Sequence, residues 1–186
     1  VNWVGAGLTM LVQTRDQRRT QVLLVDTSAT TTRGHTHVLA DDRDDAWVEL
    51  VPGSPALLAD GRLVMTADLN GARRLLIAGH AVTPPEMQVR SIVSIDGDAT
   101  APVVTFCANP IDDATQLHVW KWDDDGLRTI AAGPGVHGAV VGGSTIAVRT
   151  AALGQPGIST TVRSANGDWA IASYAEMPLV EPNVEL

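Results

Sequence analysis

Two histidines, His35 and His37, are the residues whose spacing most directly suggests chemistry in this sequence. They flank Thr36 in a stretch of strand-like composition. Residues two apart on a strand point to the same face, so both imidazoles could bind one metal ion. The sequence fixes no third ligand beside them, although Asp41 and Asp42 lie nearby. We therefore favour two solvent-facing histidines on an outer strand over a metal site.

Two acidic runs, residues 41–45 and residues 123–125, raise the question of calcium binding. A calcium loop supplies oxygens at alternating positions and ends on a bidentate glutamate, and neither run contains that full set. We interpret the first run as a solvated loop between structural units. The second is interpreted as a hairpin turn closed by Gly126. We predict no metal site and no cofactor.

Serine and cysteine nucleophiles are not indicated either. A serine hydrolase carries its serine in a Gly-x-Ser-x-Gly turn, and neither Gly53–Pro55 nor Gly143–Thr145 fits that pattern. Cys107 is the single cysteine, which excludes an internal disulfide. It follows the apolar stretch Val103–Phe106, so we predict a buried, unreactive thiol. We predict no catalytic residue in the chain.

The composition fits one folded domain. The chain has 186 residues, 45% of them hydrophobic, and a net charge of -8, which argues against a nucleic-acid partner. No apolar run approaches the ~20 residues that cross a bilayer, so no membrane segment is predicted. The first residue is Val1, and we expect a piece of a larger protein. Lys121 is the single lysine among thirteen basic residues, and this bias toward arginine indicates a bacterial source. We expect the parent protein to be cytoplasmic, and a secreted or periplasmic parent is left open.

Short apolar runs separated by turn dipeptides dominate the chain. The first two runs, Leu8–Val12 and Val22–Val25, enclose the polar insert Arg15–Arg19, which is the pattern of a β-hairpin. No segment keeps helical spacing over three turns. Dipeptides that supply positive φ angles for tight turns recur along the chain: Asp60-Gly61, Asn70-Gly71, Asp96-Gly97, Asp125-Gly126, Gly142-Gly143 and Asn166-Gly167. These observations predict an all-β fold.

The hairpins group into four units of four antiparallel strands with a period of roughly 40–50 residues, which is typical of β-propeller blades. We predict a partial β-propeller over residues 1–175, and we expect the segment 176–186, with Pro178 and Pro182, to be a linker. The blades are expected at residues 1–46, 47–85, 86–135 and 136–175. A β-sandwich of two sheets is the alternative. Four blades either close on themselves or form part of a larger ring.

Four stretches, in this order, resemble the later blades of the N-terminal propeller of dipeptidyl peptidase IV and its bacterial relatives in the prolyl oligopeptidase group. The first is Gln13–Arg19, where the family has a strand followed by a polar turn, and the second is Trp47-Val48 with Pro52, Pro55 and Asp60-Gly61, which match the opening of a blade. The third is Gly71–Leu76, which matches the entry into a strand. The fourth is Leu117–Trp120, which matches a strand after an acidic loop.

The resemblance implies a place in a two-domain serine peptidase. In this family an eight-bladed propeller caps an α/β-hydrolase domain, whose Ser, Asp and His cleave dipeptides after a penultimate Pro or Ala. The chain corresponds to roughly the second half of that propeller, and residues 176–186 correspond to the linker toward the hydrolase domain. The expected partners are this hydrolase domain and a peptide substrate. The paired glutamates that hold the substrate's amino terminus belong to an earlier blade, and no such pair occurs here.

Three positions are substrate-side candidates by the same resemblance. Family members place an aromatic residue and an arginine just after the Trp-Val pair, and the corresponding positions here are Leu50 and Val51. Neither keeps the family's residue type. Trp47 is the third candidate, with packing of Trp47 and Leu50 between blades as the alternative. Arg15, Arg18 and Arg19 are rim candidates, with solvated loop charges as the alternative.

We therefore expect the non-catalytic propeller portion of a dipeptidyl-peptidase-IV-like serine peptidase, which shapes and gates peptide access to a hydrolase domain. The alternative is a stand-alone propeller or sandwich that acts as an interaction scaffold. A third hypothesis is a closed four-bladed propeller that binds a sugar or a metal at its central mouth. Because an open arc leaves two faces uncovered, two copies of the chain are expected to pair.

Overall fold

The computed structural model describes residues 2–4, 7–26, 35–176 and 179–180 of the 186-residue chain. All regular secondary structure in these ranges is β-strand, which confirms the all-β prediction. The sixteen strands form four antiparallel sheets of four strands each, in place of the two sheets of the sandwich alternative. Within each sheet, strands that follow one another in the chain are hydrogen-bonded neighbours.

The sheets are named here by their order in the chain. The first sheet contains β1 (Asn2–Val4), β2 (Gly7–Gln13), β3 (Arg19–Asp26) and β4 (His35–Arg43). The second sheet contains β5 (Ala56–Leu57), β6 (Leu63–Leu69), β7 (Ala72–Ile77) and β8 (His80–Ala81). The third sheet contains β9 (Met87–Gly97), β10 (Pro102–Pro110), β11 (His118–Asp123) and β12 (Gly126–Ala131). The fourth sheet contains β13 (Val136–Gly142), β14 (Thr145–Ala151), β15 (Ser159–Ser164) and β16 (Gly167–Ile171).

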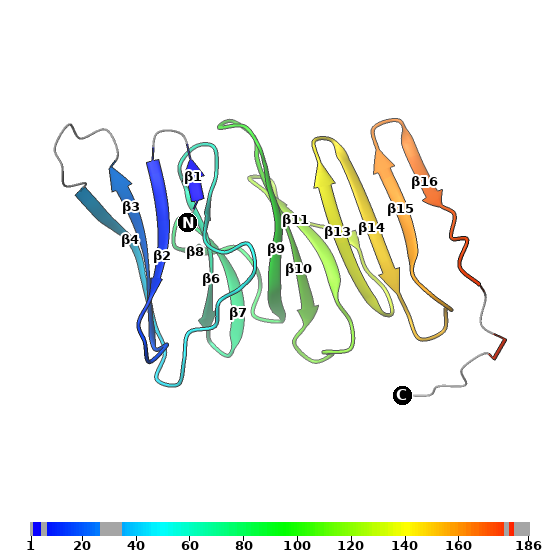
Figure 1. Ribbon diagram of the computed structural model, residues 1–186, viewed down its shortest axis with the longest axis horizontal. Helices are drawn as coiled ribbons and strands as arrows, with labels where there is room; N and C mark the ends of the chain where they lie inside the picture. The colour runs from blue at the N-terminus through cyan, green and yellow to red at the C-terminus, as the bar shows by residue number, and fades with distance from the viewer. Residues whose placement is uncertain (1, 5–6, 27–34, 177–178, 181–186) are drawn as a thin grey trace.

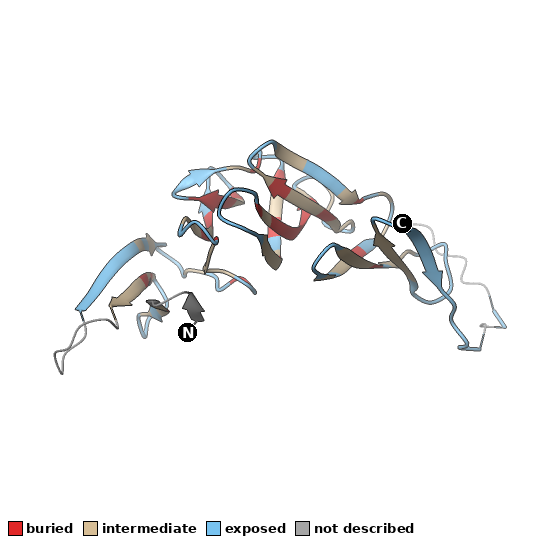
Figure 2. Cartoon of the chain, turned by 90° about the horizontal axis from the view of Figure 1, so that it is seen from above, coloured by how far each residue is buried: buried red, intermediate tan, exposed pale blue. Residues whose placement is uncertain are grey.

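The four sheets follow one another in a row along the longest axis of the molecule (Figure 1). Seen from above, the row bends into an open arc, with the first and the fourth sheet at opposite ends (Figure 2). The described residues therefore form no closed ring, and the hypothesis of a closed four-bladed propeller is wrong. The reason is that the first and fourth sheets lie at opposite ends of the arc and do not meet (Figure 2).

Strand β10 is the centre of this row because it is buried on both faces. Successive residues of a strand point in opposite directions. Val104, Phe106 and Ala108 enter an apolar cluster shared with the second sheet, whereas Cys107 enters a cluster shared with the fourth sheet. Phe106 is 0% exposed and Cys107 is 4% exposed. The third sheet is therefore held from both sides.

The seam between the second and third sheets contains the larger apolar cluster, and most buried residues in Figure 2 lie in these two sheets. Its members come from strands β6, β7, β9, β10 and β11 and from the β5–β6 connection: Leu58, Val64, Leu75, Ile77, Met87, Val89, Ile92, Val104, Phe106, Ala108 and Trp122. Each fully buried side chain of this size contributes about 1.5–3 kcal/mol relative to an exposed one. This seam is the main hydrophobic core.

An arginine covers the rim of the same seam. The Arg62 guanidinium donates to both carboxylate oxygens of Asp124 at 3.0 and 3.2 Å, and to Asp60 at 2.6 Å. It also lies 5.6 Å from the ring centroid of Trp122, within cation–π range. Arg62 thus joins the turn before β6 to the β11–β12 turn, and the acidic run 123–125 serves as an ion-pair partner there.

Backbone hydrogen bonds and one histidine join the third and fourth sheets. The Leu117 amide donates to Gly135 O at 3.0 Å, and the His137 amide donates to Leu117 O at 2.8 Å. The buried His137 ring contacts Gly133 O through Nε2 at 3.2 Å and Thr150 Oγ1 through Nδ1 at 2.9 Å. Because a carbonyl oxygen only accepts, Nε2 carries a proton. His137 is a structural residue of this seam.

Gly53 provides a sharp test of the contact between the second and third sheets. Its φ is +80°, and a Cβ built there would lie 2.3 Å from Ile92 O, whose own amide donates to Pro52 O at 2.8 Å. Gly61 has a similar φ of +88° with nothing within 4 Å of its Cβ position. Gly61→Ala should therefore cost only the left-handed strain, about 1–2 kcal/mol.

Gly53→Ala should cost the same strain and, in addition, the clash with Ile92 O. We expect it to lower the free energy of unfolding, measured with urea, by at least ~1 kcal/mol more than Gly61→Ala does. Equal losses from the two substitutions would contradict the close approach of residues 52–53 to β9.

Candidate functional site

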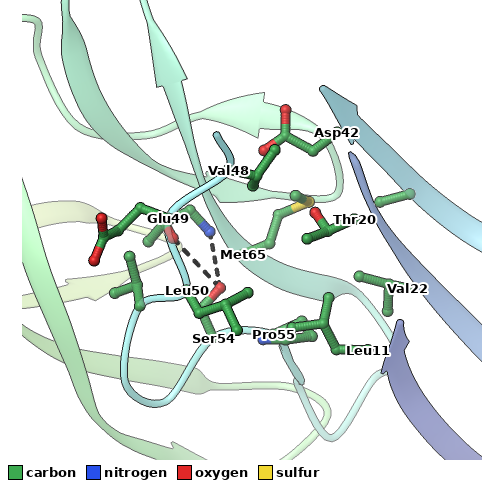
Figure 3. Close-up of a pocket in the computed structure, with 13 residues that line it drawn as sticks. Leu11, Thr20, Val22, Asp42, Val48, Glu49, Leu50, Ser54, Pro55 and Met65 are labelled. Atoms are coloured by element: carbon green, nitrogen blue, oxygen red, sulfur yellow. Dashed lines mark hydrogen bonds between the residues drawn. The ribbon is translucent and has the colours of Figure 1, made fainter. Parts of the chain in front are cut away.

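The segment that joins the first and second sheets, residues 44–55, carries the three substrate-side candidates. It forms one wall of a hollow between these sheets (Figure 3). Leu11 and Val22 of the first sheet line the hollow with Met65 of the second, and Leu50 and Val51 lie on the connecting segment. Trp47 does not line it. The structure thus places two of the three candidates at one seam.

The hollow is too small for a peptide. It leaves about 20 Å³ open to molecules the size of water, which is room for about one water molecule. The Ser54 hydroxyl accepts the Thr66 amide at 3.1 Å at its edge, and the carboxylate of Glu49 points away from it (Figure 3). The hollow is therefore a packing defect of the seam, and a peptide could only contact its outer rim.

The three candidates differ in exposure. Trp47 is 59% exposed and Leu50 is 50% exposed, whereas Val51 is 5% exposed. The Trp47 ring is oriented by its neighbours, because its amide donates to Asp44 Oδ1 at 3.0 Å and its Nε1 donates to Glu49 Oε2 at 3.1 Å. Trp47 and Leu50 offer contact surface, whereas Val51 packs inside the seam.

The arginine-rich turn of the first hairpin contacts the same segment. The Thr14 and Asp16 side chains close the turn with a hydrogen bond of 2.6 Å, and Gln17 adopts a positive φ of 61°. Gln17 O accepts the Val48 amide at 2.7 Å. The Gln13 side-chain amide donates in turn to Val48 O at 3.0 Å. Two stretches that the sequence singled out separately therefore form one rim.

We call the open depression beside this turn the rim hollow. It measures about 550 Å³, and its lining is almost wholly polar: Thr14, Arg15, Asp16, Arg18, Arg19, Arg43, Asp44 and Asp45. Four of these residues are arginines and three are aspartates. Its chemistry suits contact with a polar partner that carries both charges, and it contains no nucleophile.

Asp41 ties together the arginines at one edge of the rim hollow. Arg19 forms a bidentate ion pair with it, Arg43 Nε donates to it at 3.3 Å, and Gln21 donates to it at 3.1 Å. The hydrogen bonds from Arg19, followed by those from Arg43, hold the pKa of Asp41 well below its ordinary value. Asp41 and Arg19 are thus engaged with each other. Neither Arg15 nor Arg18 takes part in an ion pair among those of the described residues.

Asp42 lies on the opposite face of the same strand, at the hollow between the sheets. Partial burial raises its pKa, and the negative charges of Asp68, Asp44 and Asp41 raise it further. The Arg43 amide donates to Asp42 Oδ1 at 3.0 Å. This hydrogen bond lowers the pKa of Asp42, but the net shift is still a rise. The fold therefore disfavours the charged form of Asp42.

Metal-binding candidates from the sequence are dispersed or occupied by other contacts. Within the described ranges, no group of three or more His, Cys, Asp or Glu side chains is arranged to hold a metal ion. His35 and His37 are exposed on β4. Asp44 caps the turn that follows β4, since it accepts the Ala46 amide at 2.7 Å. Asp123 accepts from Arg128 at 2.8 Å and pairs with Lys121.

Cys107 lies in the cluster between the third and fourth sheets, which confirms the predicted burial. Desolvation raises the pKa of its thiol, which disfavours the reactive thiolate. Its Sγ lies 3.9 Å from His137 O. The sequence pointed to Asp42 only as an acidic residue near His35 and His37, and it assigned no role to His137, because both roles depend on strands that pack against these residues.

Comparison with known protein families and with curated proteins finds no match for the chain. Among the residues that the structure describes, no helix has the length and hydropathy needed to cross a membrane.

Asp42 allows a prediction about pH dependence. Its pKa is raised in the folded state, so the folded protein binds this proton more tightly than the unfolded chain does. Stability should therefore fall as the pH rises from the unfolded value near 3.9 through the higher folded value. Asp42→Asn removes this titration. We expect the variant to be more stable than the original protein at pH 7, and we expect this difference in the free energy of unfolding to disappear near pH 4.

Urea unfolding at the two pH values measures this effect, and Asp45→Asn at the exposed neighbouring position is the matched control. A loss of stability at pH 7 for Asp42→Asn, or an equal gain for Asp45→Asn, would contradict the assignment.

Proposed function

We propose that the chain is a partial β-propeller. Four antiparallel sheets of four strands, stacked in chain order along an arc, support this architecture. The third sheet packs its two faces on its two neighbours, as a blade does. The single observation that carries the proposal is the double burial of β10, since a blade between two blades has an apolar residue on both of its faces.

We further propose that this propeller portion is non-catalytic and belongs to a dipeptidyl-peptidase-IV-like serine peptidase, in which it shapes and gates peptide access to an α/β-hydrolase domain. The order of the four family-like stretches supports this assignment. Two of them, Gln13–Arg19 and Trp47-Val48, meet at the rim of the first sheet through the Val48 amide and Gln17 O. This meeting point is the proposed gate.

The chemistry of the gate fits a peptide better than an apolar ligand. Trp47 and Leu50 are half exposed and can cover an apolar side chain. Arg15 and Arg18 line the rim hollow beside them and can contact carbonyl or carboxylate oxygens. Val51 supports this surface from within the seam. In this proposal the parent acts in the cytoplasm of a bacterium.

A stand-alone interaction scaffold is the second candidate. The observation in its favour is the rim hollow of about 550 Å³, which is lined by both positively and negatively charged residues. It would serve a protein partner as well as it would serve a peptide. In this case no hydrolase domain exists, and the rim binds its partner without turnover.

The coding sequence on both sides of these 186 residues distinguishes the two candidates. The peptidase proposal expects a Gly-x-Ser-x-Gly motif downstream and a Glu-Glu pair upstream, because the triad and the amine anchor must both come from outside the chain. Flanking sequence that lacks both would contradict it and leave the scaffold.

Turnover by the purified chain is the biochemical counterpart. We expect no release of p-nitroaniline from Gly-Pro-p-nitroanilide above the buffer rate and no labelling by a fluorophosphonate, because no described serine lies in a nucleophile turn. Ser54, whose hydroxyl is bonded to Thr66, serves as the check: Ser54→Ala should change neither readout. Turnover that a pure preparation retains, or that Ser54→Ala abolishes, would contradict the non-catalytic assignment.

A further inference from the structure

The outer face of the fourth sheet carries a row of apolar residues that no other described part of the chain covers. Val148 and Ala139 point toward the third sheet, so their neighbours along each strand point outward. Cross-strand partners share a face. On the outer side this places Val140 opposite Ala147, Ala147 opposite Val162, and Val162 opposite Trp169. Val140 is 68% exposed and Trp169 is 50% exposed.

One apolar residue from each of the four strands thus forms a row across this face. Ile171, which is 56% exposed, lies on the same side of β16, two residues from Trp169. Next to this row is a depression of about 300 Å³ lined by Val136, Val140, Ala151, Ile158 and neighbouring residues. The neighbouring row on this face holds Gly138, Arg149, Thr160 and Ile171, so the face combines an apolar row with one exposed arginine. A sheet face in water normally carries more polar residues than this.

The outer face of the first sheet has the same character. Thr20 and Val22 point into the hollow toward the second sheet, so Leu23 points outward. Leu23 is paired with Met10 on one side and with Val38 on the other, and Val38 is 55% exposed. The adjacent Val12 is 46% exposed. The ion cluster of Arg19, Asp41 and Arg43 borders this apolar patch at one end.

We propose that these two end faces bind a second copy of the chain, so that the fourth sheet of each copy packs on the first sheet of the other. The chain itself shows the pattern in two apolar seams, where the second sheet packs on the third and the third packs on the fourth. The first and second sheets face each other in the same order across the hollow. The two uncovered faces are the trailing face of the last sheet and the leading face of the first, so one chain carries both halves of a further seam. The proposal rests on the proposed propeller architecture and concerns these 186 residues by themselves. In the parent of the peptidase proposal, the other blades of the ring would take the place of the second copy.

The area argues for closure by both contacts at once. Four strands about 4.8 Å apart and about six residues long, at ~3.3 Å per residue, give a face of about 400 Å². One contact between two copies would bury about 800 Å² in total, which is the size of an adventitious contact, whereas two contacts bury about 1,600 Å², the size of a stable interface. A two-fold dimer satisfies both contacts, and the concave arc leaves the end faces free to meet.

Sedimentation velocity of the full chain across about 1–100 μM tests the pairing, a span that brackets a micromolar Kd. We expect a dimer, and we expect Val140→Asp and Val38→Asp each to raise Kd at least tenfold, because each places a charge in both seams of the dimer. Ile111→Asp is the matched control. Ile111 is 48% exposed in the turn after β10, outside both end faces, and its substitution should leave Kd unchanged. Circular dichroism confirms that each variant folds.

Mixing the two variants separates this geometry from other dimers. A dimer of one Val140→Asp chain and one Val38→Asp chain has both charges in one seam and no charge in the other seam. A dimer of either variant alone has one charge in each seam. The mixture should therefore associate more tightly than either variant alone. In a dimer that joins two identical faces, one of the two substitutions would have no effect and mixing would restore nothing.

Each other outcome overturns the proposal. A monomer throughout the range would show that the end faces do not bind a second copy. Open oligomers larger than a dimer would show that the two contacts do not close into a two-fold dimer. A dimer that Val140→Asp and Val38→Asp do not weaken would show that the copies meet elsewhere. None of these results bears on the coding-sequence test or on the turnover test, so failure of the pairing is distinct from failure of the proposed function.

Discussion

Burial of β10 on both faces is the constraint on which the rest of the structure depends. Phe106 and its neighbours hold the second sheet, and Cys107 with Val119 and Val148 holds the fourth. A strand in this position must carry apolar residues at consecutive positions, which is why the stretch from Pro102 to Pro110 lacks the polar alternation of a surface strand. The core is concentrated in the middle of the row, and the end sheets depend on it.

The polar side chains that invite a catalytic interpretation mostly stabilise this row. His137 satisfies a carbonyl and a hydroxyl in one seam, Arg62 and Asp124 cover another, and Asp44 caps the turn that leaves the first sheet. Groups engaged in this way are poor acids, bases or ligands. In the proposed function, the chain offers a partner the shape and charge of its rim.

The fold was predictable from the sequence because its strands and turns are local. Period-two and continuous apolar runs marked the strands, and Asn70-Gly71, with φ angles of 55° and 81°, shows the turn geometry that such dipeptides favour. The site was less predictable. The bond between Gln17 and Val48, the partial burial of Asp42 and the close approach of Gly53 to Ile92 join residues far apart in the chain, and no local pattern specifies them.

Native-state hydrogen exchange, at concentrations where the chain is monomeric, tests the central role of β10 most directly. Amides open with the free energy of the unit that contains them. The account predicts that the amides of β10, together with those of β9 and β7 beside it, exchange most slowly, and that those of β4 and β16 exchange fastest. Exchange that is slowest in an end sheet, or equal in all four sheets, would contradict a row held together from its middle.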